Sequence, residues 1–115
     1  MDSDFLDNWH VQLRKGLLEL CILNALRGKR LYGYDIVKRL SAIDGLLISE
    51  GTVYPILSRF KAERLVDTTL EESQSGPARK YYQLTPRGER TLREMNRVWG
   101  VVQDAVGSLT TERRT

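Results

Sequence analysis

The thirteen residues from Gly76 to Gly88, GPARKYYQLTPRG, constrain the fold more than any other segment of this 115-residue chain. Gly76-Pro77 predicts a tight turn, and the tyrosine pair that follows has the β-propensity of a strand. Thr85-Pro86 predicts the N-cap and first residue of a helix, because proline lacks the N–H that this position would leave unpaired. The segment therefore predicts a hairpin in which Arg79 and Lys80 lie on the arm directly after the turn, and in which the second strand leads into a helix. Such a basic hairpin suits contact with nucleic-acid phosphates.

Apolar residues at helical spacing predict three helices before this hairpin. The first helix is apolar around most of its surface, which suits the centre of a core, and Gly28 suits the left-handed position at its end. Ser49 can act as the N-cap of the third helix. The expected elements are helices at about 9–27, 31–40 and 49–64 and strands at 65–70 and 79–84. This order, mainly α with a small β-hairpin, predicts a winged helix-turn-helix, in which the third helix enters the DNA major groove and the hairpin, or wing, contacts phosphates.

Basic residues are concentrated in two segments, although the net charge of the chain is only +3. Residues 27–39 contain five cations and one carboxylate, and residues 79–90 contain four cations and one carboxylate. The two segments could form one face for a polyanion if the fold brings them together. Charge alone also allows a solvated surface on which the charge is unevenly spread.

The helix expected after the hairpin, from Pro86 to about Leu109, has a heptad pattern. Its apolar residues follow one another at intervals of three and four: Leu92, Met95, Trp99, Val102, Val106 and Leu109. A helix about 36 Å long extends past so small a domain, so we expect this seam to be the interface of a homodimer. Residues 1–85 would then form the DNA-binding domain, and 86–115 the dimerisation helix with a short tail. A helix folded back on its own core is the alternative.

Three segments of the chain together resemble the PadR family of transcriptional regulators: LYGYDIVKRL at 31–40, GTVYPILSRFKAERLV at 51–66 and GPARKYYQLTPRG at 76–88. The single helix after the wing resembles the small subgroup of that family. The resemblance implies a homodimeric repressor that binds inverted-repeat operators in double-stranded DNA, needs no cofactor, and leaves the DNA when an aromatic or lipophilic compound binds. One departure is Arg64, at a position where the family usually has glycine. The third helix therefore ends differently here, or Arg64 takes a disfavoured left-handed conformation.

The resemblance also implies which residues contact DNA. They are Tyr32, Thr52, Tyr54, Pro55, Ser58, Arg59 and Lys61 in or near the two central helices, and Arg79 and Lys80 on the wing. Arg59 could make a bidentate guanine contact or a phosphate contact. Pro55 should disturb the second turn of its helix, either as a simple irregularity or as a shape that fits the groove.

Trp99 lies in the middle of the heptad seam and suggests a site for an effector. In drug-sensing members of the small PadR subgroup, a tryptophan at the matching place pairs with its twofold mate and sandwiches flat aromatic ligands. The effector site implied here comprises Trp9, Met95, Trp99 and Val102, with Val11 nearby. Ordinary packing of Trp99 in the dimer interface is the alternative.

Other classes of function find little support in the sequence. His10 is the only histidine and Cys21 the only cysteine, so we expect neither a metal cluster nor a nucleophile–base pair, and no enzyme. No apolar run approaches the ~20 residues of a membrane span, and a single cysteine allows no internal disulfide, which favours a cytoplasmic location. The remaining alternatives are a winged-helix regulator without a ligand and a protein-interaction module.

Overall fold

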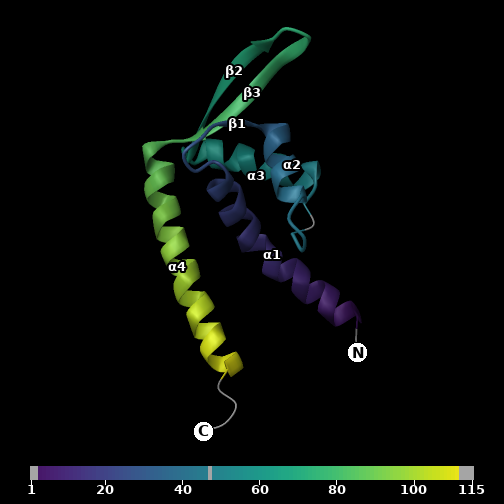
Figure 1. Ribbon diagram of the computed structural model, residues 1–115, viewed down its shortest axis with the longest axis vertical. Helices are drawn as coiled ribbons and strands as arrows, with labels where there is room; N and C mark the ends of the chain where they lie inside the picture. The colour runs from purple at the N-terminus through teal and green to yellow at the C-terminus, as the bar shows by residue number, and fades with distance from the viewer. Residues whose placement is uncertain (1–2, 47, 112–115) are drawn as a thin grey trace.

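The chain forms four helices and a three-stranded antiparallel sheet over residues 3–46 and 48–111, the part that the computed structural model describes (Figure 1). In chain order the elements are α1 (Ser3–Ala25), β1 (Leu31–Tyr32), α2 (Gly33–Ser41), α3 (Glu50–Ala62), β2 (Val66–Ser73), β3 (Gly76–Leu84) and α4 (Pro86–Thr111). The strands lie in the order β1-β3-β2. The predicted class, mainly α with the element order of a winged helix-turn-helix, is confirmed. The two-residue strand β1 is an addition, because so short a strand leaves no pattern in the sequence.

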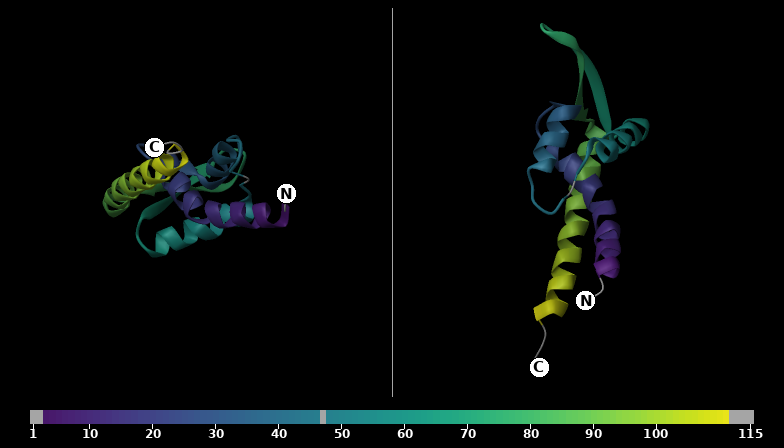
Figure 2. Two further views of the ribbon diagram at one scale, coloured as in Figure 1. Left: turned by 90° about the horizontal axis from the view of Figure 1, so that it is seen from below. Right: turned by 90° about the vertical axis from the view of Figure 1, so that its right-hand side faces the viewer.

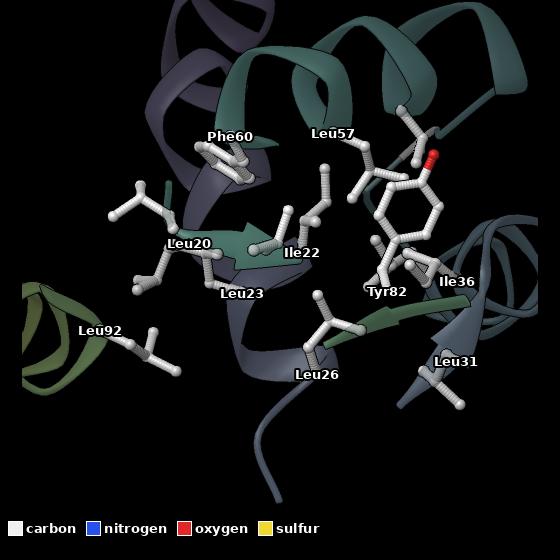
Figure 3. Close-up of a cluster of buried hydrophobic side chains, with 14 of the residues drawn as sticks. Leu20, Ile22, Leu23, Leu26, Leu31, Ile36, Leu57, Phe60, Tyr82 and Leu92 are labelled. Atoms are coloured by element: carbon white, nitrogen blue, oxygen red, sulfur yellow. The ribbon is translucent and has the colours of Figure 1, made fainter. Parts of the chain in front are cut away.

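The core lies where α1, α2 and α3 meet the sheet. Ile22 and Leu23 of α1 and Leu26, just after it, are almost completely buried there, with Leu57 of α3 and Tyr82 of β3 (Figure 3). Burial of apolar surface is the main favourable contribution to folding, and no fully buried residue in the described part of the chain is polar or charged. α1 is therefore the central helix, as its largely apolar surface predicts.

The wing consists of β2 and β3, and its turn lies earlier than the sequence predicts. Ser73 pairs with Gly76, so the turn residues are Gln74 and Ser75, and Gly76-Pro77 already belongs to β3. Proline is tolerated there because β1 pairs only with Tyr81 and Tyr82, which leaves the outer part of β3 with a free edge. The prediction of a turn at Gly76-Pro77 is wrong by two residues, whereas Arg79 and Lys80 lie on the arm of the hairpin, as expected.

Helix ends follow the local signals in the sequence. Gly28 after α1 has a φ of 73°, and Arg64 after α3 has a φ of 62°. Arg64 therefore takes the left-handed conformation that favours glycine. Ser49 is the N-cap residue of α3, but its hydroxyl makes no cap hydrogen bond and lies 3.2 Å from Thr52 Oγ1 instead.

The beginning of α4 is joined closely to the segment after α3. The Thr85 hydroxyl donates to the carbonyl of Arg64 at 2.7 Å and accepts from the Gly88 N–H at 2.9 Å. The backbone N–H of Thr85 donates to the carbonyl of Leu65 at 3.1 Å. A Cβ added to Gly88 would lie 2.0 Å from this same carbonyl oxygen, so the approach requires glycine. Thr85 is thus the N-cap that the sequence predicts, and it also connects α4 to the segment that follows α3.

α4 packs against the rest of its own chain only along its first half. Leu92 is 2% exposed and belongs to the core, so the prediction of Leu92 as a dimer-seam residue is wrong. A continuous helical stripe does not reveal where packing against the helix's own core ends. Asn96 and Asn24 of α1 donate amide hydrogen bonds to each other, both at 3.0 Å. Trp99 is half-buried against the core, and the apolar residues beyond it are exposed.

The molecule is elongated, with the wing at one end and the free ends of α1 and α4 at the other (Figures 1 and 2). Its radius of gyration is 17.0 Å, against about 13 Å for a compact chain of this size. α1 begins at Ser3 rather than near Trp9, and its first turns are exposed. No helix in the described residues is long and apolar enough to cross a membrane.

Candidate functional site

α3 has a buried face, formed by Val53, Leu57 and Phe60, and an exposed face. The residues of α3 that are predicted to contact DNA fall into two stripes on the exposed face. Tyr54, Ser58 and Lys61, at intervals of four and three, form the outward stripe. Thr52, Pro55 and Arg59 form the second stripe and border a hollow that α1 closes through Lys15, Leu18 and Glu19. The helix runs through Pro55 without interruption.

Arg59 is engaged within its own chain. Its guanidinium forms an ion pair with Glu19 of α1, and this hydrogen bond and charge raise the pKa of Arg59. Half of the Arg59 side chain is nevertheless exposed. Of the residues predicted on α3, Arg59 is therefore directed toward α1, whereas Lys61 extends into solvent.

Four tyrosines gather where β1, α2, α3 and β3 meet, and we call Tyr32, Tyr34, Tyr54 and Tyr81 the tyrosine cluster. The ring of Tyr32 lies 6.4 Å from that of Tyr34 and 5.8 Å from that of Tyr81, between centroids. Tyr54 lies so close to Gly33 that a Cβ there would be 2.5 Å from its ring. Burial, followed by the charges of Glu50 and the neighbouring tyrosines, raises the pKa of Tyr54. The cluster thus links α3 to the beginning of α2 and the base of the wing.

Three cations lie over rings of the tyrosine cluster. The Arg79 guanidinium is 4.7 Å from the Tyr32 ring centroid, that of Arg30 is 4.4 Å from Tyr81, and Lys38 Nζ is 5.7 Å from Tyr34. Such placements are attractive because the ring faces are electron-rich. The structure brings together Tyr32, Tyr54 and Arg79, which are predicted as site residues. Arg30 and Lys38 are not predicted as their partners, although both lie in the first basic segment.

The two wing cations lie on opposite faces of the hairpin. Arg79 pairs in register with Glu71 and Lys80 with Leu70, and successive side chains of a strand point to opposite faces. Arg79 is on the face of Tyr81, whereas Lys80 is on the face that contains Tyr82 nearer the core. Both cations are exposed. They could therefore contact different phosphates rather than form one compact patch.

α1 and α4 enclose an open apolar groove with a volume of about 430 Å³. Its lining includes Met95, Trp99 and Val102 of the predicted effector site, opposite Leu13 and Leu17 of α1. Trp99 also lines a second hollow of about 520 Å³ that reaches α2 and the loop after it. The structure thus brings three of the four predicted effector residues into one groove.

Trp9 is the exception among the predicted effector residues. It is 52% exposed and does not line the groove, and neither does its neighbour Val11. α1 and α4 diverge toward their free ends (Figure 1), which leaves the first turns of α1 too far out to close the groove. Trp9 and Val11 are therefore not part of this site within one chain.

The distal half of α4 presents a row of exposed apolar side chains. They are Val98, Val101, Val102, Val106 and Leu109, and the free end of α1 adds Phe5, Leu6 and Trp9. Val106 and Leu109 of the predicted dimer seam are thus exposed in the single chain. Solitary exposed apolar residues are common, but the five on α4 recur along half of one helix, which makes this surface a candidate for an interaction.

Residues 3–46 and 48–111 contain no group of three or more His, Cys, Asp or Glu side chains placed to hold a metal ion. Cys21 is half-buried on α1, and burial raises the pKa of its thiol. A thiol of raised pKa is a poor nucleophile at neutral pH.

Known proteins share both the sequence pattern and the fold. The transcriptional regulator PadR-like family matches residues 22–94. A PadR family transcriptional regulator from Eggerthella lenta is 34% identical over 96% of each chain, with a TM-score of 0.83. A PadR-like regulator from Bacillus cereus is 38% identical over 89% of this chain and 99% of its own, with a TM-score of 0.80.

One similar structure includes DNA. PadR of Bacillus subtilis, crystallised in complex with operator DNA, is 28% identical over 68% of this chain and 45% of its own, with a TM-score of 0.61. The family match covers more than half of the present chain, and the E. lenta regulator matches nearly all of it. The chain therefore belongs to the transcriptional regulator PadR-like family.

Proposed function

We propose that this chain is a homodimeric repressor that binds inverted-repeat operators in double-stranded DNA. In this proposal α3 enters the major groove with the stripe of Tyr54, Ser58 and Lys61, and the wing contacts neighbouring phosphates through Arg79 and Lys80. The strongest support is that the tyrosine cluster lies between the exposed face of α3 and Arg79 on the arm of the wing. The operator complex of B. subtilis PadR supports the same kind of partner.

The exposed apolar face on α4 and on the free end of α1 supports a homodimer. Val106 and Leu109 continue the heptad seam beyond the point where α4 leaves its own core. Burial of this face against a second copy would remove it from water at a gain of roughly 25 cal/mol per Å² of apolar area. A twofold axis through the seam would present two α3 helices to half-sites about one turn of DNA apart.

The apolar groove supports an effector that is aromatic or lipophilic. Trp99 offers an indole face for stacking, and Met95 and Val102 line the same groove. Binding there would act on α4, which continues into the wing through Thr85. A regulator without a ligand, in which Trp99 only packs in the interface, is the alternative.

DNA binding is tested by fluorescence anisotropy with a labelled duplex from upstream of the protein's own gene, over a range of salt concentrations. Arg79→Ala with Lys80→Ala removes four wing cations per dimer. We expect the slope of log K against log salt to become shallower by about 2 to 4, because fewer counterions are released. Affinity for unrelated DNA should fall by a similar factor, since phosphate contacts do not read sequence.

The matched control is Arg93→Ala with Arg97→Ala, which removes the same charge from exposed positions along α4. This variant should keep the parent's slope. Equal losses in the two double variants would mean that net charge alone governs binding. A parent protein that binds no DNA at low salt would favour the protein-interaction module instead.

A further inference from the structure

Glu71 and Arg79 face each other in the wing, yet the Glu71 carboxylate pairs with a different arginine. The two residues are in direct cross-strand register, which sets their Cβ atoms about 4.5–5.5 Å apart on one face. Opposite charges so placed normally attract each other. In this structure Glu71 instead forms an ion pair with Arg30, from the segment between α1 and β1.

Arg30 is fixed by contacts with three residues of the wing. Besides pairing with Glu71, it donates from Nη1 to Thr69 Oγ1 at 3.1 Å, and its guanidinium lies 4.4 Å from the centroid of the Tyr81 ring. Thr69 and Tyr81 are themselves cross-strand partners. Arg30 therefore holds the Glu71 carboxylate by an ion pair that does not include Arg79.

Arg79 is supported by Tyr32 of β1. Its guanidinium lies over the Tyr32 ring at 4.7 Å, and Tyr32 contacts Tyr81 at 5.8 Å between ring centroids. We call Arg30, Tyr81, Tyr32 and Arg79 the Arg–Tyr ladder. A guanidinium that rests on an aromatic face keeps the N–H donors at its edge available for a phosphate.

We propose that Arg30 and Tyr32 are positioning residues for Arg79: Arg30 keeps Glu71 from neutralising the Arg79 guanidinium, and Tyr32 holds that guanidinium ready for a phosphate. The inference rests on the proposed DNA binding, and it adds that the wing contact with DNA requires Arg30 and Tyr32 as well as Arg79. It also changes the role of Tyr32, which becomes a support for a DNA contact rather than a contact itself.

The proposal predicts that loss of Arg30 disables Arg79. In Arg30→Ala, Glu71 is free to pair across the strands, and the dimer loses two effective cations. The salt slope should become shallower by about 2, and affinity at 0.1 M salt should fall on the order of tenfold to a hundredfold, as for Arg79→Ala. Adding Glu71→Gln to Arg30→Ala removes the competing carboxylate and should restore most of the slope.

The matched control is Glu72→Gln added to Arg30→Ala. Glu72 is the neighbouring exposed carboxylate on β2, and its removal changes the net charge by the same amount. Rescue by Glu71→Gln but not by Glu72→Gln supports the proposal. Equal rescue by both, or by neither, overturns it, and the second outcome would make Arg30 a direct phosphate contact.

Tyr32 is tested by two substitutions in two backgrounds. Tyr32→Phe keeps the ring and should bind DNA like the parent, whereas Tyr32→Leu should weaken binding several-fold, in line with the modest strength of an exposed cation–π contact. In the Arg79→Ala background Tyr32→Leu should have no further effect. A Tyr32→Phe variant as weak as Tyr32→Leu would identify the hydroxyl as a DNA contact and overturn the positioning role.

Circular dichroism of each variant checks that it is folded. If Arg30→Ala does not fold, Arg30→Gln keeps most of the stem against Tyr81 and removes the charge, so it serves the same comparison. A parent that shows no salt-dependent binding contradicts the proposed function itself. A parent that binds while Arg30→Ala binds equally well contradicts only the present inference.

Discussion

Gly88 is the residue where α4 passes closest to the chain that leaves α3. Because a Cβ at this position would lie 2.0 Å from the carbonyl oxygen of Leu65, alanine requires the backbone of one segment to move. We expect Gly88→Ala to lower the free energy of unfolding by about 1–3 kcal/mol, the usual cost of overpacking. Urea denaturation at fixed protein concentration measures this change.

Gly51 provides the control for Gly88, because it also lies in the first turn of a helix. The nearest atom to a Cβ there is Ser49 Oγ at 3.8 Å, an ordinary contact. Gly51→Ala should therefore leave stability unchanged or raise it by up to about 1 kcal/mol through helix propensity. Equal destabilisation by the two substitutions would show that the close approach at Gly88 is not the cause.

Single residues were predictable where their role is local. Thr85 and Gly28 occupy the helix-end positions that their chemistry indicates, since a cap depends on neighbours within a few residues. Ser49 occupies the N-cap position but does not make the cap hydrogen bond. Arg30 was not predictable as the partner of Glu71, because the two lie far apart in the sequence. Pairings of that kind arise only when the wing folds beside β1.

At the scale of elements, α1 and α4 together form the groove that the effector hypothesis requires. Trp9→Phe leaves Trp99 as the only tryptophan, so its fluorescence reports on the groove. We expect flat lipophilic dyes to quench or shift this emission and to weaken DNA binding. Val102→Glu, which places a charge in the groove, should abolish the response, whereas Gln103→Glu, at an exposed position that does not line the groove, should preserve it. Unchanged emission across a varied set of dyes would contradict an aromatic effector.

The elements themselves were largely predictable, but their limits were not. Heptad spacing identified α4 correctly. It nevertheless assigned Leu92 to the dimer seam, because the same apolar stripe first packs against the core of its own chain and then continues into the exposed part of the helix. The wing was predicted from β-propensity, while its turn moved to Gln74 and Ser75 because strand pairing continues through Gly76. β1 escaped prediction because a two-residue strand exists only through its pairing with β3.

For the whole molecule, the most consequential proposal is the homodimer. Val106→Asp places a charge in the exposed part of the heptad seam and should convert the protein to monomers at micromolar concentration, because burial of an unpaired charge is costly. Sedimentation velocity or light scattering measures this. Ser108→Asp adds the same charge near the same helix end but outside the seam, and should leave the mass unchanged. A parent that is monomeric at all concentrations would contradict the proposal.

The whole arrangement was predictable because three segments with distinct chemistry occur in a fixed order. Helix, helix, helix and hairpin allow few ways to bury the apolar faces, and in the observed core α3 buries Val53, Leu57 and Phe60, which recur at helical spacing. The tilt of the wing could not be predicted. At the wing, Tyr32, Tyr81 and two arginines from distant parts of the sequence stack on one another, and such long-range contacts leave no local pattern in the sequence.

The close junction at Thr85 and Gly88 has a consequence for the size of any movement. α4 contains 26 residues and is therefore about 39 Å long. If it tilts as a rigid rod about its beginning, a shift of about 3 Å at the far end corresponds to only about 5° at the junction, by the same rise per residue. In the proposed dimer, a shift of a few ångströms at the far end of α4 would thus rotate α3 by only a few degrees. An effector could therefore change the relative orientation of the two α3 helices by a few degrees and weaken DNA binding, while each DNA-binding domain stays folded.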